Sequence, residues 1–218
     1  EMQPGDLLLW TLVLGCVVSS AVADQRPNIL WLSCEDLSPH LGCYGDGVAR
    51  TPQIDALARR SIRFTQACSV AGVCAPSRSA IITGIYPTTL GTHLMRCRAK
   101  LPPEAVPFPA LLRRAGYYCT NNSKTDYQFE PPPDVWDESN GKAHWRNRPR
   151  GDQPFFAVFN FTGTHESAVV NSAKRRQAVA NVPPTSRETA AQTLPPYYPD
   201  TAAVREEWGR YYDCIAAL

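Results

Sequence analysis

The sequence lacks several features that mark particular classes of protein. Lysine and arginine (22) nearly balance aspartate and glutamate (20), so the net charge of +2 gives no bulk attraction to nucleic acid or to an anionic membrane. The eight cysteines include no Cys-x-x-Cys pair, which argues against a structural zinc site of the usual spacing. No internal repeat is present. The 218 residues are enough for one sizeable core.

An apolar run from Leu7 to Val18 precedes Ala21-Val22-Ala23, a small-residue cleavage pattern. The run has about 12 residues, too few to span a bilayer comfortably. We therefore expect residues 1–23 to be a signal peptide that is removed on export. The mature protein would then be secreted or periplasmic, with no stable membrane span. An uncleaved anchor is the alternative.

Strand and helix signals alternate along the rest of the chain. Apolar runs predict strands at residues 28–33, 63–67, 117–120 and 155–161. Helical patterns predict a helix opening at Thr51-Pro52, one from Pro76 to Gly84, one at 108–115, and one capped by Asp200. Polar, proline-rich composition predicts irregular segments at 131–152 and 171–199. The alternation predicts an α/β fold with a mostly parallel sheet flanked by helices.

Four ionisable residues come directly after predicted strands: Glu35, Asp36, Lys124 and His165. Ligands of parallel sheets collect at the carboxyl ends of the strands. We therefore expect these side chains to gather at one rim. Taken singly, each is more often a solvated or structural residue than a catalytic one.

Residues 74–84 read Cys-Ala-Pro-Ser-Arg-Ser-Ala-Ile-Ile-Thr-Gly. The pattern places Cys74 at or just before a helix N-terminus, where backbone N–H groups favour negative charge. Arg78 lies one turn further along on the same face. Considered alone, Cys74 is also compatible with a reactive thiol or with a buried cysteine that acts as a small hydrophobe.

This stretch resembles the signature of the type I sulfatases. The segments Trp-Leu-Ser-Cys-Glu-Asp and Ala-Gly-Val-Cys-Ala-Pro-Ser-Arg are similar to bacterial sulfatases related to heparan N-sulfatase. The resemblance implies the alkaline-phosphatase-like sulfatase fold and the hydrolysis of sulfate esters or sulfamates in a sulfated small molecule or glycan. It also implies that a formylglycine-generating enzyme oxidises Cys74 to formylglycine. One hydroxyl of the hydrated aldehyde then attacks sulfur, and loss of the proton from the second hydroxyl releases sulfate.

The resemblance also implies a role for each candidate residue. Glu35 and Asp36, with the formylglycine from Cys74, would bind Ca²⁺ or Mg²⁺, which prefer oxygen ligands; family members usually carry Asp-Asp at the first two positions. Arg78 would support the formylglycine, and Lys124 would neutralise charge on the sulfate. His165 would contact the sulfate or protonate the leaving group. Where the family often has a histidine, two residues after the lysine, this chain has Asp126.

Full-length sulfatases are considerably longer than this chain and supply further metal and sulfate ligands. We therefore expect residues 24–218 to be the N-terminal part of a catalytic domain, and the 218 residues alone to turn over substrate weakly or not at all. Two other functions remain open. One is a phosphonate or phosphate monoester hydrolase of the same superfamily. The other is a secreted, non-catalytic remnant that binds glycans.

Overall fold

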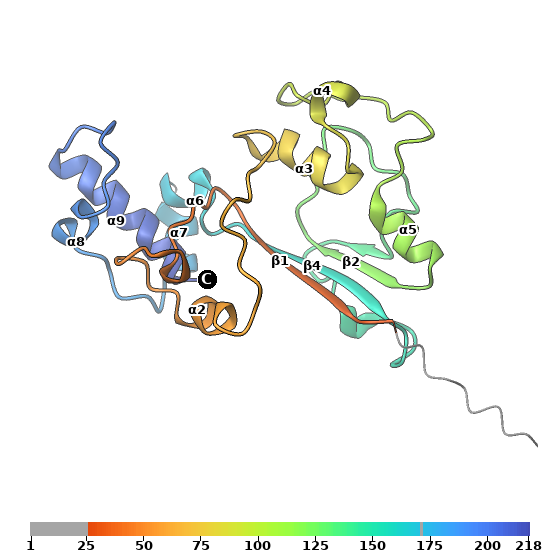
Figure 1. Cartoon of the computed structure of the whole chain (residues 1–218), viewed down its shortest axis with the longest axis horizontal. Helices are drawn as coiled ribbons and strands as arrows, with labels where there is room; N and C mark the ends of the chain where they lie inside the picture. Colours follow the sequence, from red (N-terminus) through yellow and green to blue (C-terminus); the bar gives the residue numbers. More distant parts are fainter. Residues whose placement is uncertain (1–25, 171) are drawn as a thin grey trace, which may run out of the picture.

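The structure, a computed structural model, describes residues 26–170 and 172–218 (Figure 1). The strands are β1 (Ile29–Cys34), β2 (Tyr118–Asn122), β3 (Glu138–Ser139) and β4 (Phe155–Phe161). The α-helices are α2 (Pro52–Ala58), α3 (Cys74–Thr83), α4 (Pro87–Leu90), α5 (Phe108–Arg114), α6 (Glu166–Val170), α7 (Ser172–Ala178), α8 (Arg187–Ala191) and α9 (Ala202–Ala216). Two 3₁₀ turns, η1 (Gly42–Tyr44) and η2 (Trp145–Asn147), complete the elements.

The four strands form one sheet in the order β1-β4-β2-β3, and every pair is parallel. The α/β prediction is therefore confirmed. Helices α3, α4 and α5 lie on one side of the sheet, and α6 to α9 lie beyond the carboxyl ends of β1 and β4 (Figure 1). This arrangement puts the loops that follow the strands next to the start of α3.

The main core fills the space between the sheet and α5. Its buried members are Tyr117, Cys119, Phe156 and Val158, with Phe108, Leu112 and Trp136 packed against them. Trp31 of β1 stacks on Phe108 of α5 with ring centroids 6.0 Å apart. The aromatic side chains therefore fix the distance between the sheet and the helix layer.

Strand β1 differs from the prediction of a buried strand. It is an edge strand that pairs only with β4 among the described residues. Its side chains alternate between two faces, so Trp31 packs against the core while Leu30 and Leu32 are 55% and 65% exposed. An apolar run therefore identified the strand but not the fact that one of its faces is open.

The last helix packs against α8 and α6. Gly209 permits this contact, because a Cβ there would lie 3.0 Å from the carbonyl oxygen of Thr185. The predicted amphipathic helix is confirmed, but its cap is Thr201, whose hydroxyl accepts a hydrogen bond from Val204 N at 3.3 Å. Asp200 pairs with Arg205 instead.

Two predicted segments differ in the structure. Residues 63–67 form no strand; Arg63 donates to the carbonyl of Cys43 and lies 5.8 Å from the Tyr44 ring. The segment 171–199, predicted to be irregular, contains α7 and α8. Its prolines fall between α7 and α8 or between α8 and α9, and the Ser186 side chain caps α8 by accepting from Thr189 N. Proline content therefore marked the helix ends rather than an absence of helices.

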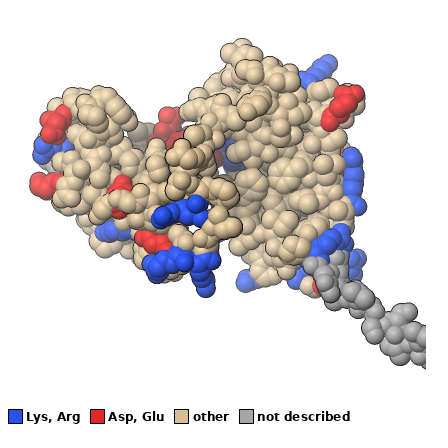
Figure 2. Space-filling model, in the orientation of Figure 1, with Lys and Arg blue, Asp and Glu red and all other residues tan. Residues whose placement is uncertain are grey.

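Among the described residues, no helix is long and apolar enough to cross a membrane, and all seven cysteines are unpaired. The predicted signal peptide, residues 1–23, lies outside the described part of the chain. Basic and acidic side chains are scattered in small groups over the face drawn in Figure 2. That distribution agrees with the near-neutral net charge of the sequence.

Candidate active site

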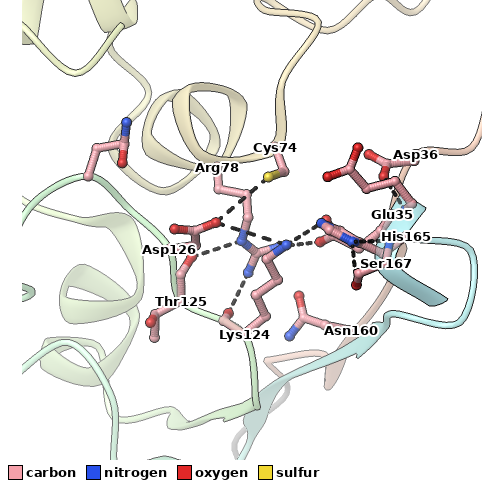
Figure 3. Close-up of polar contacts among 12 residues, drawn as sticks. Glu35, Asp36, Cys74, Arg78, Lys124, Thr125, Asp126, Asn160, His165 and Ser167 are labelled. Atoms are coloured by element: carbon pink, nitrogen blue, oxygen red, sulfur yellow. Dashed lines mark hydrogen bonds and ion pairs between the residues drawn. The ribbon is translucent and has the colours of Figure 1, made fainter. Parts of the chain in front are cut away.

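Polar residues from four segments converge at the carboxyl end of the sheet (Figure 3). Glu35 and Asp36 follow β1, Cys74 and Arg78 lie on α3, Lys124 and Asp126 follow β2, and His165 follows β4. The expected rim therefore exists. It forms because parallel strands end on the same side of the sheet and α3 begins above them.

Cys74 is the first residue of α3, whose N-cap is Val73. Pro76 fits in the first turn, where N–H groups lack a helical partner and its missing donor costs nothing. The helix ends at Gly84, which adopts a left-handed conformation (φ 70°). The half-buried Cys74 thiol lies with its Sγ 3.7 Å from Asp126 Oδ2. The predicted position of the cysteine at a helix N-terminus is confirmed.

Arg78 joins α3 to the loop after β2. Its Nε donates to the carbonyl of Thr125 at 2.8 Å, and its NH2 group donates to the carbonyl of Lys124. Its NH1 lies 3.5 Å from Glu35 Oε1, and its guanidinium lies 5.8 Å from the Tyr127 ring. Arg78 is therefore a fixed part of the site rather than a solvated helix residue.

Glu35 is only 5% exposed, and two cations balance it. Its Oε2 lies 2.7 Å from Lys124 Nζ, in addition to the Arg78 contact. Its backbone is fixed as well: Glu35 N donates to the Phe161 carbonyl at 3.2 Å, and the Thr164 hydroxyl donates to the Glu35 carbonyl. A buried carboxylate without such partners would be strongly disfavoured, so the ion pairs are what permit this burial.

Asp36 is exposed and adopts a positive φ of 44°. Its Oδ2 accepts a hydrogen bond from Glu166 N at 2.9 Å, at the start of α6. Its carbonyl accepts from the Tyr211 hydroxyl of α9 at 3.4 Å. Asp36 thus connects the end of β1 to the group of helices beyond it.

His165 lies immediately before α6. Its Nδ1 is 2.9 Å from Ser167 Oγ and accepts from Ser167 N at 3.2 Å. The imidazole borders an open pocket of about 620 Å³, whose lining includes Lys124 and Asn160. The ring is therefore held by its own loop and faces a space next to the sulfate-binding lysine that the sequence predicts.

Sequence reasoning missed two supporting residues. Asn160 accepts from Ser33 Oγ at 3.0 Å and donates to Asn121 Oδ1 at 2.9 Å, so it connects β1, β4 and β2 below the site. A lone amide inside the apolar run Phe155–Phe161 was an available signal. Ser167, which orients His165, left no recognisable pattern in the sequence.

The site offers ligands for a cation. One ligand atom each from Glu35, Cys74 and His165 lies within 4.8 Å of the others. Asp36 adds a carboxylate next to Glu35 along the chain. Two adjacent carboxylates fit a hard cation such as Ca²⁺ or Mg²⁺. Arg78 and Lys124 already balance the Glu35 carboxylate, so a metal ion must share it with them or displace one of them.

The comparison with known proteins agrees with this geometry. The family model described as Sulfatase matches residues 27–150, more than half of the chain, so the chain belongs to the sulfatase family. It is 40% identical over 233 aligned residues to an ulvan-active sulfatase of Formosa agariphila. That match covers 89% of this chain and 39% of the relative, so the chain spans about two fifths of that protein's length.

Solved structures show that the fold is the alkaline-phosphatase-like fold of sulfatases. A protein bound to its substrate, D-glucosamine-2-N,6-O-disulfate, matches with a TM-score of 0.57 at 19% identity, over 86% of this chain and 53% of that chain. The phosphonate monoester hydrolase of Agrobacterium radiobacter matches with a TM-score of 0.60 at 17% identity, over 88% and 57%.

Proposed function

We propose that the whole protein hydrolyses sulfate esters or sulfamates of a sulfated glycan, with formylglycine made from Cys74 as nucleophile and Ca²⁺ or Mg²⁺ as cofactor. The observation that carries this proposal is the position of Cys74 at the first residue of α3. Arg78, Lys124, Glu35 and His165 surround the same rim. In its converted form, Cys74 would supply a hydrated aldehyde whose hydroxyl attacks sulfur.

Different residues of the chain would stabilise the sulfate and bind the metal ion. The N-terminus of α3 presents backbone N–H groups to the negative charge of the sulfate. Lys124 and Arg78 place two cations beside it and stabilise charge that develops on the sulfate oxygens. Glu35 and Asp36 would hold the metal ion, which polarises a sulfate oxygen as a Lewis acid.

His165 is suited to proton transfer to the leaving group. Its ring is held by Ser167, and it borders the pocket next to Lys124. A histidine in this position can donate a proton to the departing oxygen or nitrogen near neutral pH. We therefore assign it the role of general acid.

The choice of a sulfated glycan depends on the relatives. The relative at 40% identity is named an ulvan-active sulfatase, and one structural neighbour was solved with a glucosamine disulfate. The phosphonate monoester hydrolase, at 17% identity, and the neighbour solved with glucosamine disulfate, at 19%, resemble this chain in fold alone, so the preference for sulfate rests on the relative at 40% identity. The ion pairs of Arg78 and Lys124 with Glu35 stabilise the buried carboxylate in a non-catalytic glycan-binding remnant as well, so turnover by the converted protein decides between the two.

Maturation and export are part of the proposal. Conversion of Cys74 requires contact with a formylglycine-generating enzyme. Residues 1–23 carry the apolar run and small-residue cleavage pattern of an export signal. We infer that the mature protein acts outside the cytoplasm, in the periplasm or as a secreted protein, where large sulfated glycans are accessible.

Mass spectrometry tests the modification directly. Trypsin cleavage after Arg63 and Arg78 releases residues 64–78, which contain both Cys68 and Cys74. After co-expression with a generating enzyme, this peptide should lose about 18 Da once, as one thiol carbon becomes an aldehyde. Fragment ions should place the loss at Cys74 and leave Cys68 open to alkylation. Iodoacetamide labelling of both cysteines would overturn the proposal.

Turnover tests the reaction class. The whole protein, after conversion, should hydrolyse an aryl sulfate and a glucosamine sulfate faster than an aryl phosphonate. The reverse order would favour the phosphonate hydrolase. Turnover of neither substrate by protein whose conversion has been verified would favour the glycan-binding remnant.

A further inference from the structure

The unconverted thiol gives this site a second set of ligands. Sulfur of Cys74, a ring nitrogen of His165 and a carboxylate oxygen of Glu35 lie within 4.8 Å of one another. We propose that the chain with an intact cysteine binds Zn²⁺ through these three side chains. Formylglycine has no sulfur, so conversion of Cys74 would remove this zinc site.

The distances suit a tetrahedral ion. Zinc binds sulfur at about 2.3 Å, nitrogen at about 2.0–2.1 Å and oxygen at about 2.0–2.2 Å. Ligand atoms on a tetrahedron of that size are about 3.3–3.6 Å apart. The present separations of at most 4.8 Å therefore need to close by no more than about 1.5 Å, which side-chain rotation can supply. Three protein ligands leave the fourth position open.

Ser167 is the residue that contacts the His165 ring at Nδ1. Its hydroxyl lies 2.9 Å from Nδ1. Nδ1 now accepts from Ser167 N at 3.2 Å, so binding of zinc through Nε2 requires the ring proton to move to Nδ1, which can then donate to Ser167 Oγ in place of that contact. A hydrogen bond of this kind fixes the ring orientation in metal sites and raises the basicity of the ligand.

The thiol also determines which metal is preferred. Thiolate and imidazole ligands favour Zn²⁺ over Ca²⁺ or Mg²⁺, which take oxygen ligands. Asp36 belongs to the proposed calcium site but is not among the three residues whose ligand atoms lie within 4.8 Å of one another, and its Oδ2 accepts from Glu166 N at 2.9 Å. The two sites therefore share Glu35 and position 74, which is formylglycine in one and cysteine in the other, and they differ at Asp36 and His165.

Lys124 competes with the metal. Its Nζ lies 2.7 Å from Glu35 Oε2, so zinc must displace the ammonium to reach that carboxylate. Removing the charge without shortening the side chain much, as in Lys124→Met, should tighten zinc binding. Loss of a ligand should weaken it. Zinc affinity should therefore rise in Lys124→Met and fall when a ligand is lost. Nonspecific binding to an acidic surface would not fall when the Cys74 or His165 side chain is removed.

Cobalt spectroscopy of the chain produced without a generating enzyme provides the test. Co²⁺ should give a thiolate charge-transfer band and intense tetrahedral visible bands, and one equivalent of Zn²⁺ should abolish both. Cys74→Ser should remove the charge-transfer band, and His165→Ala should remove the tetrahedral bands. Asp36→Asn, the matched control, should retain both. Ser167→Ala should weaken binding by about 10- to 100-fold.

Alkylation provides a second measurement. Zn²⁺ should protect Cys74 from iodoacetamide while Cys68, in the same tryptic peptide, stays reactive. Circular dichroism of each metal-free variant checks that it is folded. Absence of the charge-transfer band from the folded chain, or equal losses in Asp36→Asn and Cys74→Ser, would overturn the proposal. Neither result would affect the proposed sulfatase function, which uses the converted residue.

Discussion

Asp126 Oδ2 lies 3.7 Å from Cys74 Sγ, so a carboxylate contacts the residue that the signature assigns as nucleophile. The other oxygen of Asp126 pairs with Arg96 at 2.9 Å, and Lys124 Nζ lies 4.0 Å from Oδ2. This is the position where resemblance to the family leads one to expect histidine. In the proposed formylglycine mechanism, a carboxylate at this distance would accept the proton of the second hydroxyl, the step that releases sulfate.

We predict that Asp126→Asn lowers kcat of the converted whole protein by about 10²-fold or more, because the amide cannot accept that proton. Asp126→His should restore part of the rate. Steady-state kinetics on an aryl sulfate measures both. Arg96→Ala is the matched control, because it breaks the ion pair and leaves the carboxylate in place. Full activity in Asp126→Asn would show that another group takes the proton.

In the converted whole protein, Lys124→Ala should lower kcat/KM by about 10²- to 10³-fold, because it removes the cation that we propose binds the sulfate. It also takes one of two cations from the buried Glu35 carboxylate. Lys142→Ala removes an exposed lysine that is not part of the candidate site, so it should change kcat/KM little. Comparable losses in the two variants would contradict a sulfate-binding role for Lys124.

The parallel sheet and the rim could be predicted from sequence because both depend on local patterns. Phe155–Phe161 is a continuous apolar run, and the structure confirms it as β4 with the same bounds. Pro76 and Gly84 predicted a helix through the backbone preferences of single residues, and the structure confirms it as α3, which begins two residues earlier, at Cys74, and ends at Thr83 before Gly84. These signals do not depend on what packs against them.

Acid stability should depend on Asp46. Burial raises the pKa of this carboxyl, but hydrogen bonds from Tyr212, the backbone of Ala49 and Val48, and His40 outweigh burial and lower it below 3.8. A lowered pKa stabilises the fold above the unfolded-state value and loses that contribution as pH falls through the folded-state value. Asp46→Asn should therefore reduce the free energy of unfolding at pH 7 by about 1.5–3 kcal/mol.

The acid dependence of this variant should also be shallower than that of the parent chain. Urea unfolding between neutral pH and pH values below 3.8 measures it. Asp152→Asn, at a carboxylate whose side chain is 84% exposed, should follow the parent curve. Identical pH profiles for the Asp46 variant and the parent would refute the contribution of Asp46.

Thiol reactivity should follow burial. Burial, with a smaller contribution from Asp137, raises the pKa of Cys119 to about 12, although Arg113 opposes the shift. At pH 8 its thiolate fraction is then about 10³-fold below that of a cysteine with the ordinary value. Cys68 is exposed. Iodoacetamide followed by peptide mapping should label Cys68 first, and urea should remove the difference. Equal native rates would contradict the described core.

Parts of the site could not be predicted, because they depend on contacts between distant segments. The ion pair of Glu35 with Lys124 joins residues 89 positions apart. Nothing local distinguishes that lysine from a solvated one. Ser167 acts only through the ring of His165, and a serine near a helix start is common. The sequence motifs therefore identified the candidate residues, whereas their contact partners were visible only in the folded structure.

The open face of β1 has a practical consequence for handling the isolated chain. Leu30 and Leu32 project from a sheet edge whose outward backbone groups can pair with another strand. At high concentration, such a seam promotes self-association. A lysine at position 30 or 32 would be a rational first change to keep the polypeptide dispersed for spectroscopy, since neither residue is among those that form the candidate active site.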